Sequence, residues 1–219
     1  MMLRLAIALL ATSLCGSAPA LAQLSPSTSG FSTAPTSAND EEYFYMLRQL
    51  GPCLASNKRD RAIAFLDAPI DSPQEAAAFD ALFGDTTNRC MQNFVSATLV
   101  RAWVRGVVAE GLFKDAMRDW PESTVPAIEE PESIASIHDF ARCYVARDFA
   151  AARGLIEETR LGDKSELVRM RELAPTFGPC MPQGSQIALK PINIRMALAE
   201  ALYHATRNPG AARLPGQSD

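Results

Sequence analysis

Two stretches of this chain, RGVVAEGLF (105–113) and RMALAEALY (195–203), decide its fold, because one repeats the other after 90 residues. The cysteines repeat with the same shift, in two pairs of equal spacing: Cys53 and Cys90, then Cys143 and Cys180. A shared period over separate segments indicates an internal duplication. We therefore predict an all-α fold of two tandem helical repeats, about four helices each, packed with pseudo-two-fold symmetry.

The helical prediction rests on apolar spacing, helix-start residues and abundant alanine. The first repeat predicts helices over residues 41–50, 59–66, 73–83 and about 98–118. The second predicts them over residues 136–147 and 149–158, from a capping pattern at 163–166, and over 191–206. Gly51 and Pro52 are expected to break or kink the first helix, because proline lacks the N–H that an interior helical position donates.

The two long helices each keep one arginine and one glutamate at matching positions: Arg105 and Glu110, then Arg195 and Glu200. Arg and Glu of one helix lie on different sides and cannot face each other. One interpretation pairs Arg105 with Glu200 and Arg195 with Glu110, or each with a backbone carbonyl or a helix end, because an unpaired buried charge is costly. The alternative interpretation makes Glu110 and Glu200 a carboxylate pair for acid–base or glycosidase-like chemistry. We favour the structural pairing.

Export is predicted from the N-terminus, where Arg4 precedes a short apolar run and an A-x-A site ends at Ala22. A lipoprotein reading of Cys15 is weaker, because Leu14 precedes it. The predicted organisation is a signal peptide (1–22), a disordered Ser/Thr/Pro-rich leader (23–39), repeat 1 (40–118), a linker (119–133), repeat 2 (134–207) and a flexible tail (208–219). We expect a periplasmic or secreted protein without an integral membrane segment after cleavage.

Cleavage would leave four cysteines, and exported cysteines in even number are typical of disulfides. All three pairings are compatible with the repeat. Descent from one ancestral unit with its own bridge favours Cys53–Cys90 and Cys143–Cys180. No C-x-x-C occurs, and His138 and His204 are the only histidines. We therefore expect no metal and no cofactor, and we interpret both histidines as exposed surface residues.

The charge balance excludes one class of partner. Cleavage would leave 20 basic against 25 acidic residues, a net charge of −5, and no basic cluster is present, so nucleic acid is not an expected partner. A phosphate loop, a serine-hydrolase elbow, H-E-x-x-H and a calcium loop are also missing from the sequence.

The segments FGPCMP (177–182), ALAEALY (197–203) and CYVARDFAAARGLIEE (143–158) resemble a group of uncharacterised proteins of sphingomonad-type bacteria. These are secreted, two-repeat, cysteine-paired helical proteins. The resemblance covers most of the second repeat and, more faintly, the first, where Asn88 and Arg89 replace Gly178 and Pro179. It implies export and a helical, cysteine-paired fold, and it implies no activity, substrate or catalytic residue.

The sequence favours a non-catalytic binding or scaffold protein of the periplasm or cell envelope, whose partner is a protein or an envelope component. One alternative is a small envelope hydrolase using Glu110 or Glu200. Another is a structural or stress-related envelope protein without a specific ligand. If Glu110 and Glu200 point into one open pocket, the enzyme is favoured; if an arginine seals either one, the scaffold is favoured.

Overall fold

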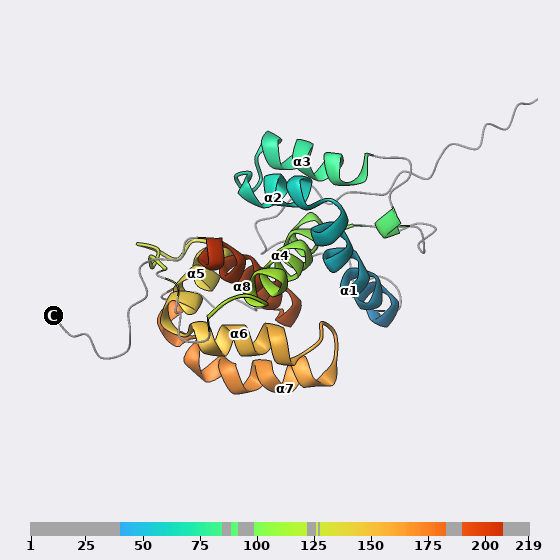
Figure 1. Cartoon of the computed structure of the whole chain (residues 1–219). Coiled ribbons are helices and arrows are strands. Elements are labelled where there is room, and N and C mark those ends of the chain that lie inside the picture. Colours follow the sequence, from blue (N-terminus) through green and yellow to red (C-terminus); the bar gives the residue numbers. More distant parts are fainter. Residues whose placement is uncertain are drawn as a thin grey trace, which may run out of the picture.

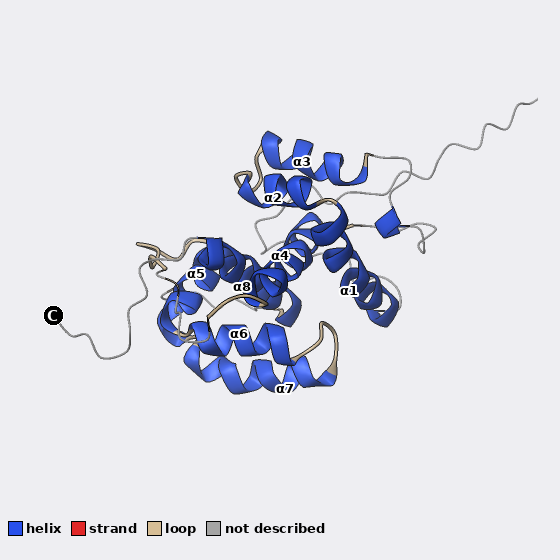
Figure 2. Cartoon of the chain, in the orientation of Figure 1, coloured by secondary structure: helices blue, strands red, loops and turns tan. Residues whose placement is uncertain are grey.

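The computed structural model describes residues 40–84, 89–91, 99–121, 126, 128–182 and 190–207. The predicted signal peptide, leader and tail lie outside these ranges. The regular elements of the described residues are α-helices and short 3-10 helices, coloured blue in Figure 2. The predicted all-α class is therefore confirmed. None of the helices in these ranges combines the length and apolar character that crossing a bilayer requires.

The first half of the described chain forms α1 (Asp40–Asn57), α2 (Arg59–Asp67), α3 (Pro73–Phe83), the 3-10 turn η1 (Arg89–Met91) and α4 (Arg101–Met117). Ser72 caps α3 by accepting a hydrogen bond from the Glu75 backbone N–H at 3.0 Å, and Pro73 follows at the first helical position. Both choices favour a helix start at this point.

The second half forms α5 (Ile137–Arg147), α6 (Phe149–Glu158), α7 (Lys164–Leu173), the turns η2 (Ala174–Thr176) and η3 (Gly178–Cys180), and α8 (Pro191–Arg207). Ser136 and Asp139 form a full capping box at the start of α5. The Asp148 side chain caps α6 by accepting from the Ala151 N–H at 2.9 Å.

Helices α4 and α8 pack against each other at the centre, with α1 on the outer side of α4 and α5 on the outer side of α8. The α2–α3 hairpin and the α6–α7 hairpin lie on opposite sides of this row (Figure 1). Gly106 makes the central contact close, because a Cβ there would lie 2.3 Å from the Met196 Cβ. The core is continuous between the halves, and most of α4 and α8 is buried.

Gly51 and Pro52 were expected to break or kink the first helix; a break there is wrong, because α1 continues through Pro52 to Asn57. Leu54 and Ala55, beyond the proline, are almost completely buried. Their burial offsets the missing hydrogen bond. Gly51 serves a different purpose: a Cβ at this position would lie 2.2 Å from the Val107 carbonyl oxygen, so glycine lets α1 approach α4.

Each half contains one disulfide. Cys53 of α1 bonds to Cys90 of η1, and Cys143 of α5 bonds to Cys180 of η3. These are the two pairs that a bridge within each repeat requires. The bonds tie a core helix to a 3-10 turn 37 residues later in both halves, and such cross-links restrict the unfolded chain.

Candidate functional site

The buried polar groups gather in two clusters, one on each side of the α4–α8 pair. The Glu200 cluster consists of Arg105, Glu75, Glu200, His138 and His204. The Glu110 cluster consists of Arg195, Glu110, Lys114, Thr159 and Glu166. The four charged residues that the sequence singled out belong to these clusters, and each arginine bonds the glutamate of the other long helix.

Arg105 lies at the centre of the Glu200 cluster with only 2% of its surface exposed. Its Nε donates to Glu200 Oε1 at 2.7 Å, and its Nη1 donates to Glu75 Oε1 at 3.2 Å. The remaining donors reach the backbone carbonyls of Phe65 and Leu66, at 2.8 and 2.6 Å. A buried guanidinium requires this degree of pairing.

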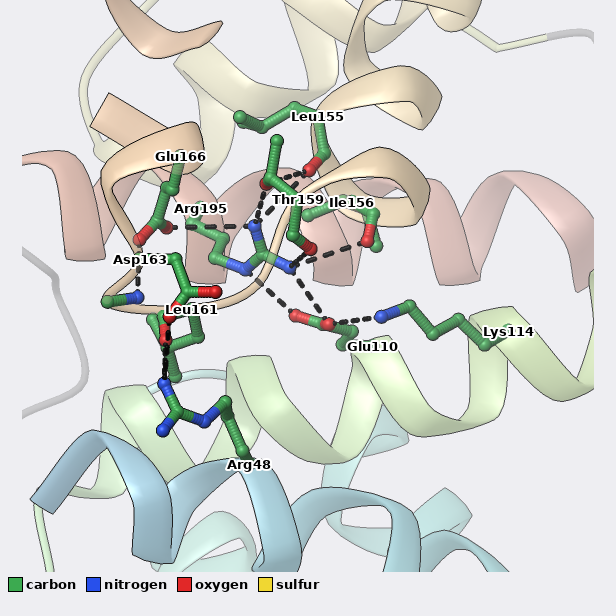
Figure 3. A network of polar contacts seen from close by, with 11 residues as sticks. Arg48, Glu110, Lys114, Leu155, Ile156, Thr159, Leu161, Asp163, Glu166 and Arg195 are labelled. Carbon is green, nitrogen blue, oxygen red and sulfur yellow. Dashed lines mark hydrogen bonds and ion pairs between the residues drawn. The ribbon is translucent and has the colours of Figure 1, made fainter. Parts of the chain in front are cut away.

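Arg195 holds the same place in the Glu110 cluster and is fully buried (Figure 3). Its Nε and Nη2 donate to the two carboxylate oxygens of Glu110, at 3.0 and 2.9 Å. Such a bidentate pair is the strongest geometry for an arginine and a carboxylate. Its Nη1 donates to Thr159 Oγ1 at 2.8 Å and lies 3.6 Å from Glu166 Oε1.

The partners of the two arginines occupy corresponding positions. Arg105 bonds the carbonyls of residues 65 and 66, and Arg195 bonds those of residues 155 and 156. Glu75 lies beside Arg105, and Glu166 lies beside Arg195. Each cluster therefore joins one hairpin, α2–α3 or α6–α7, to both central helices.

The glutamates near the starts of α3 and α7 bond the backbone N–H of the residue before the N-cap. Glu75 Oε2 accepts from the Asp71 N–H at 2.9 Å, and Glu166 Oε2 accepts from the Gly162 N–H at 2.6 Å. The Asp163 side chain makes no capping hydrogen bond. Both glutamates are buried, because their other oxygen faces the arginine of the cluster.

Glu200 lines a cavity of about 530 Å³ that two histidines border. His138 Nδ1 lies 3.5 Å from Glu200 Oε2, and His204 Nε2 lies 3.7 Å from Glu200 Oε1. The His138 side chain is only 15% exposed. Interpreting His138 as an exposed surface residue was therefore wrong: α5 packs on α8 and turns His138 toward the carboxylate.

Glu110 lines a separate cavity of about 440 Å³ with arginine and lysine side chains at its border. Lys114 Nζ donates to Glu110 Oε1 at 2.6 Å. Arg48 of α1 donates to the Leu161 carbonyl at 2.7 Å and lies 3.5 Å from Asp163 Oδ1, so it ties α1 to the loop before α7 (Figure 3).

The surroundings of these buried carboxyl groups lower the pKa of Glu200 and Glu110 and raise the pKa of Glu166. Burial raises the pKa of Glu200, but the approach of His204 and the charges of Arg105 and His138 lower it to about 2. For Glu110, burial is likewise outweighed, and the charge of Arg195 lowers the pKa. Burial raises the pKa of Glu166 despite Arg195.

These features limit the chemistry of the site. Glu110 and Glu200 line different cavities, so they do not act on one bound molecule as a carboxylate pair. Both are ionised and engaged by arginine, whereas a general acid needs a raised pKa. Among the described residues, no group of three or more His, Cys, Asp or Glu side chains is placed to hold a metal ion.

Sequence reasoning did not assign six cluster members: Glu75, Lys114, His138, Thr159, Glu166 and His204. The sequence does not show which arginine Glu75 and Glu166 meet, because that contact depends on how the hairpins pack. The histidines carried one usable signal: His138 and His204 correspond to Arg48 and Lys114 after a 90-residue shift. Lys114 and both histidines lie beside the glutamate of their cluster, whereas Arg48 bonds the Leu161 carbonyl.

Comparisons of this chain with protein-family models, with curated proteins and with solved structures found no match.

Proposed function

We propose that this chain is a non-catalytic binding or scaffold protein of the periplasm or cell envelope. One observation carries the proposal: each glutamate that could perform chemistry is bonded to a buried arginine from the other long helix. These ion pairs join the two halves of the molecule. They engage Glu110 and Glu200, the two carboxylates that the hydrolase alternative requires.

The observations weigh against the hydrolase alternative. A glycosidase of either stereochemistry uses one protonated carboxyl group and one carboxylate on opposite sides of the same bond. Glu110 and Glu200 both have lowered pKa values, and they line separate cavities. Glu166 has a raised pKa, but it lies buried against Arg195 and belongs to neither cavity.

The proposed compartment is supported by the two disulfides, since such bonds persist in oxidising surroundings such as the periplasm.

We also propose that the fold descends from a duplicated unit with pseudo-two-fold symmetry. Trp103 Nε1 donates to Asn193 Oδ1 at 2.9 Å, and these residues are 90 positions apart. Residues related by the repeat touch each other only near an axis that relates the copies. The loops before α3 and α7 also each contain one positive φ, at Asp71 and Gly162.

Chemical crosslinking in a periplasmic extract, followed by identification of captured partners, tests the binding function. A specific partner that excess untagged protein displaces is the expected result. Paired with it, Glu110→Gln and Glu200→Gln should each lower the melting temperature. Unchanged stability together with loss of a measured hydrolysis would overturn the proposal in favour of the enzyme.

A further inference from the structure

We infer that the cavity beside Glu110, here called the Glu110 pocket, binds a small organic anion through its carboxylate or phosphate group. The inference rests on the proposed binding function and names the class of ligand. The pocket has a volume of about 440 Å³, within the roughly 300–1,000 Å³ range of small-molecule sites.

Three cationic side chains line the Glu110 pocket from three different segments: Arg48 of α1, Lys114 of α4, and Arg160 of the loop after α6. Arg160 is exposed, and within the described part of the chain its side chain makes no hydrogen bond or ion pair. Its guanidinium is therefore available to a ligand. Arginine binds carboxylate and phosphate in a bidentate manner.

The local charge balance leaves positive charge for the ligand. Arg195 already neutralises the Glu110 carboxylate through a bidentate contact. Lys114 therefore adds a second positive charge beside that carboxylate. The close partner of Arg48 is a neutral carbonyl, at 2.7 Å, and Asp163 is farther away at 3.5 Å. Asp163 is the remaining carboxylate that lines the pocket. This excess is notable in a chain whose net charge is −4.

The border of the pocket also offers an apolar surface. The Tyr45 ring is 54% exposed and lies beside Arg48, with the guanidinium carbon 5.9 Å from the ring centroid. Tyr45 and Pro52 line the same cavity. An organic anion can place its charged group between the cations and its carbon skeleton against the tyrosine ring.

The test titrates inorganic phosphate and benzoate separately into the mature protein, with binding followed by calorimetry and by NMR shifts of backbone amides. Phosphate reports the phosphate class, and benzoate reports the aromatic carboxylate class. Arg160→Gln should weaken binding of the preferred probe by about tenfold. Arg171→Gln is the matched control, because Arg171 is another exposed arginine whose side chain makes no hydrogen bond or ion pair with the described residues, and it lies outside this pocket.

Binding that responds to Arg160→Gln and not to Arg171→Gln supports the inference. Equal loss in both variants, or no binding of either probe up to tens of millimolar, overturns it. Circular dichroism and the melting temperature check that Arg160→Gln folds, and Tyr45→Ala gives a second variant, which should weaken benzoate more than phosphate. If crosslinking captures a partner but neither anion binds, this inference alone is wrong. If the protein hydrolyses an ester probe at this pocket, the proposed function is wrong.

Discussion

The Glu110 and Glu200 clusters share the same buried arginine contacts. They differ in the residues at the edge of the adjoining cavity, here called the border. In both, a buried arginine of one long helix bonds the glutamate of the other and two consecutive backbone carbonyls of a hairpin. At the border, Lys114 contacts Glu110 and Arg48 lines the same cavity, whereas His138 and His204 lie beside Glu200.

The difference shows which part of the arrangement is constrained. A buried arginine without its acceptors would destabilise the protein by several kcal/mol, so the buried arginine contacts tolerate little change. The border residues face a cavity, so one basic side chain can replace another there. One border carries an arginine and a lysine, and the other carries two histidines.

Removing the central arginines should have the largest effect. Arg195→Met leaves Glu110 and Glu166 without their buried partner and should reduce the free energy of unfolding by about 3–5 kcal/mol. Arg105→Met should cost a similar amount, because it leaves Glu75 and Glu200 without their buried partner. Urea unfolding measures both variants.

A loss below about 1 kcal/mol in either variant, the size typical of an exposed ion pair, would contradict a buried arginine at the centre of each cluster.

The acid limb of stability should depend on Glu200. Its folded-state pKa is about 2 against an ordinary value of 4.5, so the unfolded state binds more protons between these values. The contribution of Glu200, on the order of 3 kcal/mol, is fully present above pH 4.5 and is lost as the pH falls toward 2. Glu200→Gln should flatten the unfolding free energy across that window. A slope equal to that of the wild type would contradict the assigned pairing.

The loops before α3 and α7 allow a smaller comparison. Gly162 has φ +81°, and a Cβ there would lie 2.5 Å from Phe44 Cδ2, so Gly162→Ala should cost about 1–3 kcal/mol. Asp71, at φ 57°, should tolerate glycine with a change below about 0.5 kcal/mol, because relieved strain is offset by a more flexible unfolded chain. Thermal unfolding of both variants checks the asymmetry.

The smallest expected effect comes from exchanging a border residue. His204→Lys recreates at Glu200 the i,i+4 pair that Lys114 makes with Glu110 and should stabilise α8 by about 0.3 kcal/mol at pH 8. The reciprocal Lys114→His should lose a similar amount at that pH. If both variants changed the stability in the same direction, positions 114 and 204 would not be equivalent.

Much of the fold could be read from local signals. Apolar spacing and helix-start residues predicted helices that the structure contains, and α2, α3, α5 and α6 begin and end within a residue of the predicted limits. Pro52 could not be read this way, because the burial of Leu54 and Ala55 that carries α1 past the proline comes from distant parts of the chain.

The sequence by itself determined the helical class, the placement of most helices, the equal spacing of the cysteine pairs and the repeated arginine and glutamate of the long helices, because each follows from local periodicity or from a shared period. Only the tertiary structure decided that Glu75 and Glu166 complete the clusters, that His138 faces Glu200, and that Arg48, Lys114 and Arg160 surround one cavity. Those groups come from helices and loops distant in sequence, and their contacts depend on how the hairpins pack against α4 and α8.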